Sequence, residues 1–212
     1  MKQIIVIGCG RFGKSVAKTL SKLGHDVMIV DSDAEKIKEL SDYVTHAVQM
    51  DAVDEASFKT IGLRNFDAAI ISIGSNIQAN IMSTLIAKEA GVPLVIAKAQ
   101  NEMHGKILEK IGADKIVFPE RDMGMRVAYG LSTPNILDVI EFSPDYSIVE
   151  TLARDDWDNK SLKELKFSKT YGLTLIAIKR GDEINISPDA DDLIKKGDLL
   201  VVLGHKDNLK NI

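Results

Sequence analysis

Through residue 118 the chain alternates short apolar runs, rich in β-branched residues, with longer stretches whose apolar residues recur every three or four positions. The apolar runs predict strands and the periodic stretches predict amphipathic helices. Strands alternating with helices form right-handed βαβ units, so the first half is predicted to be α/β, a doubly wound parallel sheet of the Rossmann type. Strands are expected at 4–7, 27–30, 45–49, 68–72, 94–97 and 115–118, with helices at 12–23, 34–40, 55–61, 77–90 and 103–111.

The predicted helix ends carry their own signals. Glycines follow four of these helices, where a left-handed residue ends a helix at little cost. Ser32 and Glu35 have the spacing of a capping box, which predicts the start of the second helix. The four glycines are Gly24, Gly62, Gly91 and Gly112.

The pattern changes after a further predicted helix at 122–131. Arg180-Gly181-Asp182 predicts a hairpin turn. We expect a Rossmann-type domain over residues 1–134 and a small α+β domain over 135–212. The second domain is expected to hold short antiparallel strands at 137–142, 147–153, 173–179, 183–186 and 199–203, and brief helices at 162–165 and 191–194.

Composition narrows the class of protein. With 45% hydrophobic and 27% charged residues the chain is typical of a soluble protein with a real core. A net charge of −4 gives no argument for nucleic acid as a partner. No apolar run approaches the roughly 20 residues that span a bilayer, and the single cysteine fits a reducing compartment. We expect a cytoplasmic protein that reaches a membrane only through a partner.

A glycine-rich turn follows the first predicted strand. Gly8, Gly10 and Gly13 have the spacing GxGxxG between a strand and a helix. In this motif the first glycine permits a tight turn, the second lets a phosphate approach, and the third packs helix on strand. Asp31 ends the second strand, where a carboxylate binds ribose hydroxyls and disfavours a 2′-phosphate. The sequence therefore predicts an adenine nucleotide site rather than an NADP site.

The same segment also fits the P-loop pattern G-x-x-x-x-G-K-S, in which Lys14 and Ser15 would contact phosphates and Mg²⁺. Two observations favour the Rossmann interpretation. It requires Gly10, which the P-loop pattern leaves free, and it gives Asp31 a role at the ribose.

Arg11 is an unusual residue inside such a turn. A guanidinium group there can pair bidentately with a terminal phosphate, which the bridge of a dinucleotide lacks. Arg11 therefore favours ATP or ADP over NAD(H) as the ligand.

Other polar positions follow the predicted strands and would gather at one edge of the sheet, where α/β folds bind ligands. Glu120 lies close to the phosphates in this arrangement only if a cation or Arg11 separates the charges, and a divalent cation such as Mg²⁺ is the natural bridge. The positions are Asp51, Ala52, Ile73, Gly74, Ser75, Lys98, Ala99, Gln100, His104 and Glu120.

Catalytic groups are not evident, and we expect no enzyme; the alternative is an NAD(H)-binding regulator or a small NAD-dependent oxidoreductase. A dehydrogenase needs a proton donor and a substrate pocket beside its cofactor. Cys9 lies within the glycine turn with no base near it in sequence, so packing is expected there. His46, in a predicted strand, is expected to be packed as well.

Runs along nearly the whole chain resemble the RCK-type regulatory subunits of Ktr and Trk potassium uptake systems. The resemblance implies an RCK N-lobe and C-lobe in a cytoplasmic homo-oligomer, usually an octameric ring built of dimers, docked on a membrane potassium-transporting subunit of the KtrB/TrkH type. ATP would favour the active ring and ADP the inactive one, and some relatives bind NAD(H). The matching runs are residues 8–13, 45–48, 63–67, 76–80, 98–101, 109–114, 118–124 and 146–150.

The resemblance also implies residue roles. Arg11 would meet the γ-phosphate, in some cases from a neighbouring subunit, Asp31 would bind ribose, and Glu120 would join an inter-subunit cation site. The complete implied cofactor set is Gly8, Gly10, Arg11, Phe12, Gly13, Asp31, Ser32, Asp33, Asp51, Ala52, Ile73, Gly74, Ser75, Lys98, Ala99, Gln100, His104 and Glu120, with Glu120 also the metal ligand.

Two departures from the family pattern matter. Certain members bind cyclic di-AMP with an arginine and an asparagine in the C-lobe, where this chain has Ser168 and Thr174, although Pro188 is retained. This counts against cyclic di-AMP as a ligand. Close relatives also carry a small residue where this chain has Lys14.

Overall fold

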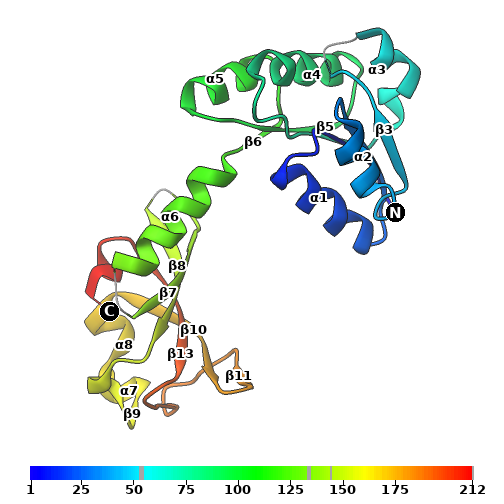
Figure 1. The fold of residues 1–212 in the computed structure, drawn as a ribbon. Helices are drawn as coiled ribbons and strands as arrows, with labels where there is room; N and C mark the ends of the chain where they lie inside the picture. The colour runs from blue at the N-terminus through cyan, green and yellow to red at the C-terminus, as the bar shows by residue number, and fades with distance from the viewer. Residues whose placement is uncertain (53–54, 133–134, 144, 212) are drawn as a thin grey trace. The chain divides into compact units, whose positions relative to one another are not determined.

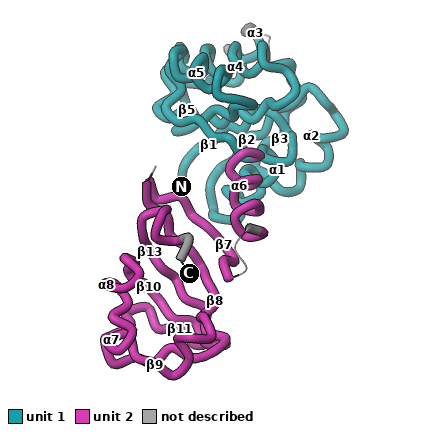
Figure 2. The backbone as a smooth tube through the Cα atoms, turned by 90° about the vertical axis from the view of Figure 1, so that its left-hand side faces the viewer, with its two compact units in different colours: residues 1–119 teal, residues 120–212 magenta. Residues whose placement is uncertain are grey.

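A computed structural model describes residues 1–52, 55–132, 135–143 and 145–211. The chain forms two compact units, Met1–Pro119 and Glu120–Ile212 (Figure 2). By this division the helix that precedes residue 133 belongs to the second unit. The predicted domain boundary falls between residues 134 and 135, and residue 134 lies outside the described residues, so that boundary stays a prediction.

The first unit is built on a six-stranded parallel sheet (Figure 1). Its strand order is β3-β2-β1-β4-β5-β6, and the order reverses between β1 and β4. Ligands of open α/β sheets bind at this kind of reversal, outside the carboxyl ends of the strands. The Rossmann prediction is confirmed. The strands are β1 (Gln3–Ile7), β2 (Asp26–Asp31), β3 (His46–Gln49), β4 (Ala68–Ile71), β5 (Leu94–Lys98) and β6 (Lys115–Val117).

Helices cover both faces of this sheet because its buried strands alternate the faces to which side chains point. Ile5 and Ile7 pack in one core with Phe58 and Leu108, whereas Ile4 and Val6 pack in the other with α1 and α2. The helices are α1 (Arg11–Lys22), α2 (Ala34–Leu40), α3 (Glu55–Ile61), α4 (Ile77–Glu89) and α5 (Glu102–Lys110), with a 3₁₀ turn at Leu63–Asn65.

The helix signals are partly confirmed. The four predicted glycines after helices all have positive φ angles, between +70° and +95°. The predicted capping box at Ser32 is wrong. Asp33 caps α2 instead, because its carboxylate accepts hydrogen bonds from the amides of Glu35 and Lys36 at 3.0 and 3.3 Å.

The second unit contains α6 (Pro119–Ser132) and an antiparallel sheet of order β11-β10-β13-β8-β7. Arg180 pairs with Glu183, so Gly181 and Asp182 form the predicted hairpin loop. The strands are β7 (Ile136–Glu141), β8 (Tyr146–Leu152), β10 (Leu173–Arg180), β11 (Glu183–Asn185) and β13 (Leu199–His205).

Short elements complete this unit and correct one prediction. The helix expected at 191–194 is wrong, because Leu193 and Ile194 form a strand that pairs with β9. These elements are a 3₁₀ turn at Asp155–Trp157, β9 (Lys160–Ser161), α7 (Leu162–Leu165), α8 (Phe167–Tyr171), β12 (Leu193–Ile194) and a 3₁₀ turn at Asn208–Asn211.

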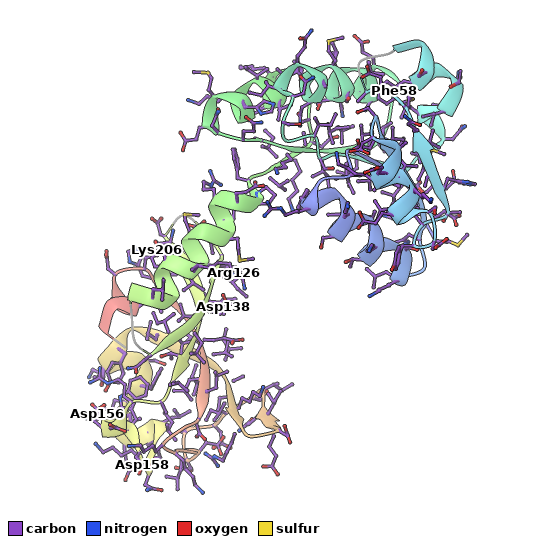
Figure 3. All side chains as sticks on the ribbon, viewed as in Figure 1. Phe58, Arg126, Asp138, Asp156, Asp158 and Lys206 are labelled. Atoms are coloured by element: carbon purple, nitrogen blue, oxygen red, sulfur yellow. The ribbon has the colours of Figure 1, made fainter. Side chains whose placement is uncertain are left out.

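An ion pair joins α6 to the sheet of the second unit. Arg126 of α6 and Asp138 of β7 lie side by side (Figure 3), and Arg126 Nε donates to Asp138 Oδ1 at 2.9 Å. Among the described residues, no helix has both the length and the apolar character needed to cross a bilayer.

Candidate nucleotide-binding site

The turn between β1 and α1 has a backbone path that requires glycine at two positions. Gly8 has a φ of +106°, and a Cβ atom there would lie 2.9 Å from the amide nitrogen of Ile73. A Cβ atom on Gly13 would lie only 2.0 Å from the carbonyl oxygen of Gly8. These contacts pack α1 directly against the end of β1, as the spacing predicts.

Gly10 differs from both of these glycines because its surroundings are open. Its φ is −68°, and a Cβ atom there would meet nothing closer than the Ser72 carbonyl oxygen at 4.0 Å. Gly10 is the N-cap of α1 and offers no capping side chain. The first amides of a helix, left without a cap, attract anions. The missing side chain at Gly10 therefore leaves room for an approaching phosphate.

Asp31 is held at the base of this turn. Its Oδ2 accepts a hydrogen bond from the Cys9 amide at 2.6 Å, and its Oδ1 accepts one from the Asp33 amide at 2.9 Å. Lys36 Nζ lies 3.8 Å from Asp31 Oδ1 and 3.2 Å from Asp33 Oδ2. Hydrogen bonding by Lys36 holds the pKa of Asp33 below its ordinary value. The carboxylate is thus fixed beside the glycine turn, and its predicted contact with ribose stays a prediction.

Ser72 is a residue that the sequence argument missed. It is buried directly after β4, and its Oγ donates to the carbonyl oxygens of Gly8 and Ile7 at 2.6 and 3.1 Å. Its amide also donates to the Ile7 carbonyl at 2.7 Å. Ser72 therefore locks the glycine turn onto β4. A serine ending the apolar run of β4 was the available signal.

The two basic residues of the turn point to different partners. Arg11 begins α1 and is exposed, and its guanidinium group makes no hydrogen bond or ion pair with any residue of the described ranges. Lys14 instead pairs with Glu39 of α2. This pairing argues against the P-loop interpretation, in which the lysine contacts phosphate. Phe12 packs into the core beneath α1.

Most predicted positions after strands do gather at one edge of the sheet. β3, β4 and β5 are parallel members of one sheet, so the segments that follow them share its carboxyl edge. A Cβ atom on Gly74 would lie 3.3 Å from Lys98 Nζ, which places that ammonium group over the β4–α4 loop. The first unit brings together Asp51, Ala52, Ile73, Gly74, Ser75, Lys98, Ala99 and Gln100, with Ser32 exposed after β2.

Glu120 belongs to the second unit, so its predicted position near the phosphates stays a prediction. Within the described ranges, no group of three or more His, Cys, Asp or Glu side chains could hold a metal ion. A cation shared with Glu120 would therefore need nucleotide oxygens or residues of a second subunit to complete its coordination.

His104 lies at the same edge but is only 2% exposed. Its Nδ1 faces the Gln100 amide at 3.4 Å, and its Nε2 has no partner among the described residues. Burial lowers the pKa of His104 below its ordinary value of 6.5. Its predicted contact with phosphate stays a prediction, since the side chain is enclosed in this conformation.

The depressed pKa of His104 predicts a pH-dependent stability. The unfolded chain binds a proton near pH 6.5 and the folded chain binds it only at lower pH, so stability is fully present above 6.5 and falls as the pH drops. Denaturant unfolding at pH 7.5 and 5.5 measures this loss. We expect the free energy of unfolding to fall less between these pH values in His104→Gln than in the wild type. Equal decreases would show that His104 is not the group responsible.

Cys9 and His46 do not form a catalytic pair. The Cys9 thiol is fully buried, and burial, followed by the charge of Asp31, raises its pKa to about 12. Such a thiol is a packing residue, as predicted, because only a thiolate is nucleophilic. The prediction that His46 is packed is wrong, since its side chain is exposed at the edge strand β3.

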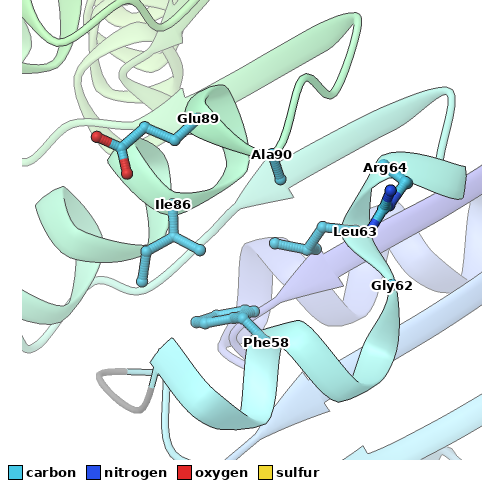
Figure 4. Close-up of a pocket in the computed structure, with 7 residues that line it drawn as sticks. All are labelled: Phe58, Gly62, Leu63, Arg64, Ile86, Glu89 and Ala90. Atoms are coloured by element: carbon cyan, nitrogen blue, oxygen red, sulfur yellow. The ribbon is translucent and has the colours of Figure 1, made fainter.

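A cavity of about 440 Å³ lies at the opposite edge of the first sheet (Figure 4). It opens between α3, the 3₁₀ turn and the C-terminal end of α4, with Phe58, Leu63 and Ile86 on its walls. Its two charged lining residues are Arg64 and Glu89. None of the predicted site residues lines this cavity.

The fold and the glycine turn define a Rossmann-type protein with an appended α+β domain, and comparisons with known proteins specify the family. Residues 4–119 match the TrkA-N domain and residues 148–212 match the TrkA-C domain. The chain is 46% identical over 209 residues to Ktr system potassium uptake protein A of Bacillus subtilis (strain 168), covering 99% of this chain and 94% of that protein. The chain belongs to this family of potassium uptake proteins, as its resemblance to RCK-type subunits predicted.

Solved structures show the same fold. The GsuK channel bound to NAD superimposes with a TM-score of 0.71 at 18% identity, over 98% of this chain and 38% of that one. The structure of GsuK bound to ADP gives a TM-score of 0.52 at 17% identity, over 58% of this chain and 32% of that one.

Proposed function

We propose that this chain is the nucleotide-switched regulatory subunit of a potassium uptake system, with ATP and ADP as its ligands. The observation that carries the proposal is the glycine turn, which is open at Gly10, flanked by the free guanidinium group of Arg11, and fixed by the carboxylate of Asp31. Phosphates would meet the first amides of α1, and ribose would meet Asp31. Family membership supports the link to potassium uptake.

Arg11 is the residue that would distinguish ATP from ADP. A switch works only when two ligands bind two states with different free energies. The γ-phosphate supplies that difference if it pairs with Arg11, because a charge-assisted hydrogen bond contributes about 1.5–3 kcal/mol. NAD(H) is the second candidate ligand, favoured by the same turn and by the NAD-bound structure of this fold. Hydride transfer is not proposed for it, because Cys9 and His104 are both enclosed.

Self-association is part of the proposal. α6 and the adjoining β7 expose large apolar side chains, among them Leu131 at 83%. Apolar groups gathered in this way favour burial against another surface. A second copy of the chain is the partner that the octameric ring of the resemblance implies. The ring would dock on a membrane potassium-transporting subunit at the cytoplasmic face. The other exposed residues are Met123, Met125, Val127 and Tyr129 of α6, Leu137 and Ile140 of β7, and Phe142 directly after it.

The test of the proposal is a pair of substitutions beside the glycine turn, one at Arg11 and one at Asp31. Arg11→Ala should weaken ATP by about tenfold or more while ADP changes much less, since one charge-assisted contact is lost. Asp31→Ala is the matched control and should weaken both nucleotides alike, because both contain the ribose. Calorimetric titration of each variant gives the dissociation constants. If Arg11→Ala lowers the affinities for ATP and ADP equally, Arg11 does not contact the terminal phosphate of ATP.

A further inference from the structure

Asn80 occupies an unusual position near the start of α4. It is completely buried, and its side-chain amide donates to two carbonyl oxygens, that of Ile73 at 2.8 Å and that of Lys98 at 3.1 Å. Those acceptors lie at the ends of two different strands. Ile73 is the second residue after β4, and Lys98 is the last residue of β5. One side chain thus bridges two neighbouring strand ends.

The bridge lies just beyond the regular pairing of these strands. The register of β4 and β5 ends with Ile71 opposite Ala97. Past this point the two segments continue into the loops that carry the candidate site. Asn80 therefore holds the backbones together at the place where the sheet no longer aligns them.

Both bridged segments lie at the carboxyl edge of the sheet, where the candidate site is expected. Lys98 Nζ lies over the β4–α4 loop, 3.3 Å from the position of a Cβ atom on Gly74. The two hydrogen bonds of Asn80 fix the spacing of the Ile73 and Lys98 carbonyl groups. They therefore fix the backbone position from which the Lys98 side chain reaches over the loop.

The chemistry of Asn80 also separates its role from packing alone. Its Oδ1 has no hydrogen-bond partner among the described residues. An unpaired buried acceptor is unfavourable, so a position needed only for packing would favour an apolar side chain. What an apolar residue cannot supply is the pair of N–H donors that Asn80 directs at Ile73 and Lys98.

We propose that Asn80 is a positioning residue, which sets Lys98 and the β4–α4 loop at the spacing that a nucleotide's phosphates require. This inference rests on the proposed nucleotide function. It assigns no direct contact between Asn80 and ligand. It predicts that loss of the bridge affects the phosphate end of the ligand and leaves the ribose end at Asp31 unchanged.

The experiment compares adenosine, ADP and ATP binding to Asn80→Ala by calorimetry. We expect ATP and ADP to weaken about tenfold, as for the loss of one charge-assisted contact, and adenosine to change less than about twofold on the same scale. Asn80→Ser, which keeps one donor, should lie between Asn80→Ala and wild type, and it provides the comparison if Asn80→Ala does not fold.

Thr84→Val is the matched control. Thr84 is buried one turn further along α4, and its hydroxyl donates to the Asn80 carbonyl at 2.8 Å without contacting either strand end. We expect a lowered melting temperature and unchanged nucleotide affinities. The positioning role would be overturned if Asn80→Ala lowered the affinities for adenosine and ATP equally, or lowered neither. A wild-type chain that binds neither ATP nor ADP would instead overturn the proposed function.

Discussion

Gly10→Ala is expected to fold normally and to lose nucleotide affinity by about 10- to 100-fold, the range that corresponds to one charged hydrogen bond. The added methyl group has room in the free protein, because its nearest neighbour would be the Ser72 carbonyl at 4.0 Å. The φ angle of Gly10, −68°, is also accessible to alanine. The methyl group occupies the space that a phosphate needs at the start of α1. Calorimetry gives the affinity, and thermal unfolding followed by circular dichroism gives the stability.

Gly13→Ala is the comparison for this result, since it lies three residues away in the same turn. Its methyl group would lie 2.0 Å from the Gly8 carbonyl oxygen and 2.3 Å from Ser72 Oγ. Overpacking of this kind destabilises a fold by about 1–3 kcal/mol, so the first unit should melt earlier. An unstable Gly10→Ala, or a Gly10→Ala that binds ATP as wild type does, would contradict the assignment of the phosphate to this turn.

Arg180→Met is expected to destabilise the second unit by about 1–3 kcal/mol, the usual effect of leaving a buried acceptor without its hydrogen-bond donor. Asp198 is 1% exposed, and Arg180 donates to both of its carboxylate oxygens at 2.8 and 2.7 Å. Burial alone would raise the pKa of Asp198, but the hydrogen bonds from Arg180 and the Lys195 amide outweigh it and lower the pKa. Denaturant unfolding measures the change, and fluorescence of Trp157, the single tryptophan, reports on this unit.

Lys196→Met provides the control for the second unit. Lys196 Nζ and Asp155 Oδ1 form an ion pair at 2.8 Å, yet their side chains are 72% and 83% exposed. Water and salt screen such an exposed pair, so it contributes little to stability, and this variant should unfold close to wild type. Similar small changes in both variants would show that Asp198 tolerates the loss of Arg180.

Much of the first unit could be predicted because its signals are local and repeated. Buried parallel strands appear as apolar runs, and the glycines after α1 and α4 mark helix ends with positive φ angles. The second unit was harder. α8, β9 and β12 span only two to five residues each, and short elements form through tertiary contacts that periodicity does not record. Leu193 and Ile194 became a strand because Lys160 and Ser161 lie opposite them.

The candidate site shows the same division. Gly8, Gly13 and Asp31 could be placed because a known motif relates their spacing to a backbone path. Ser72 and Asn80 could not, since each acts through hydrogen bonds to residues distant in sequence. Ser72 bonds to Gly8, 64 positions away, and Asn80 bonds to Lys98, 18 positions away.

The most direct test of the central claim is a calorimetric titration of the nucleotide-free chain with ATP, ADP and NADH, each with and without Mg²⁺. The account predicts saturable binding of ATP and ADP, with a preference for ATP that Arg11→Ala removes. A ligand at 100 times its dissociation constant should also stabilise the chain by about 2.7 kcal/mol. Binding of NADH alone, with no heat from ATP or ADP, would contradict the account and make a dinucleotide the ligand of the glycine turn.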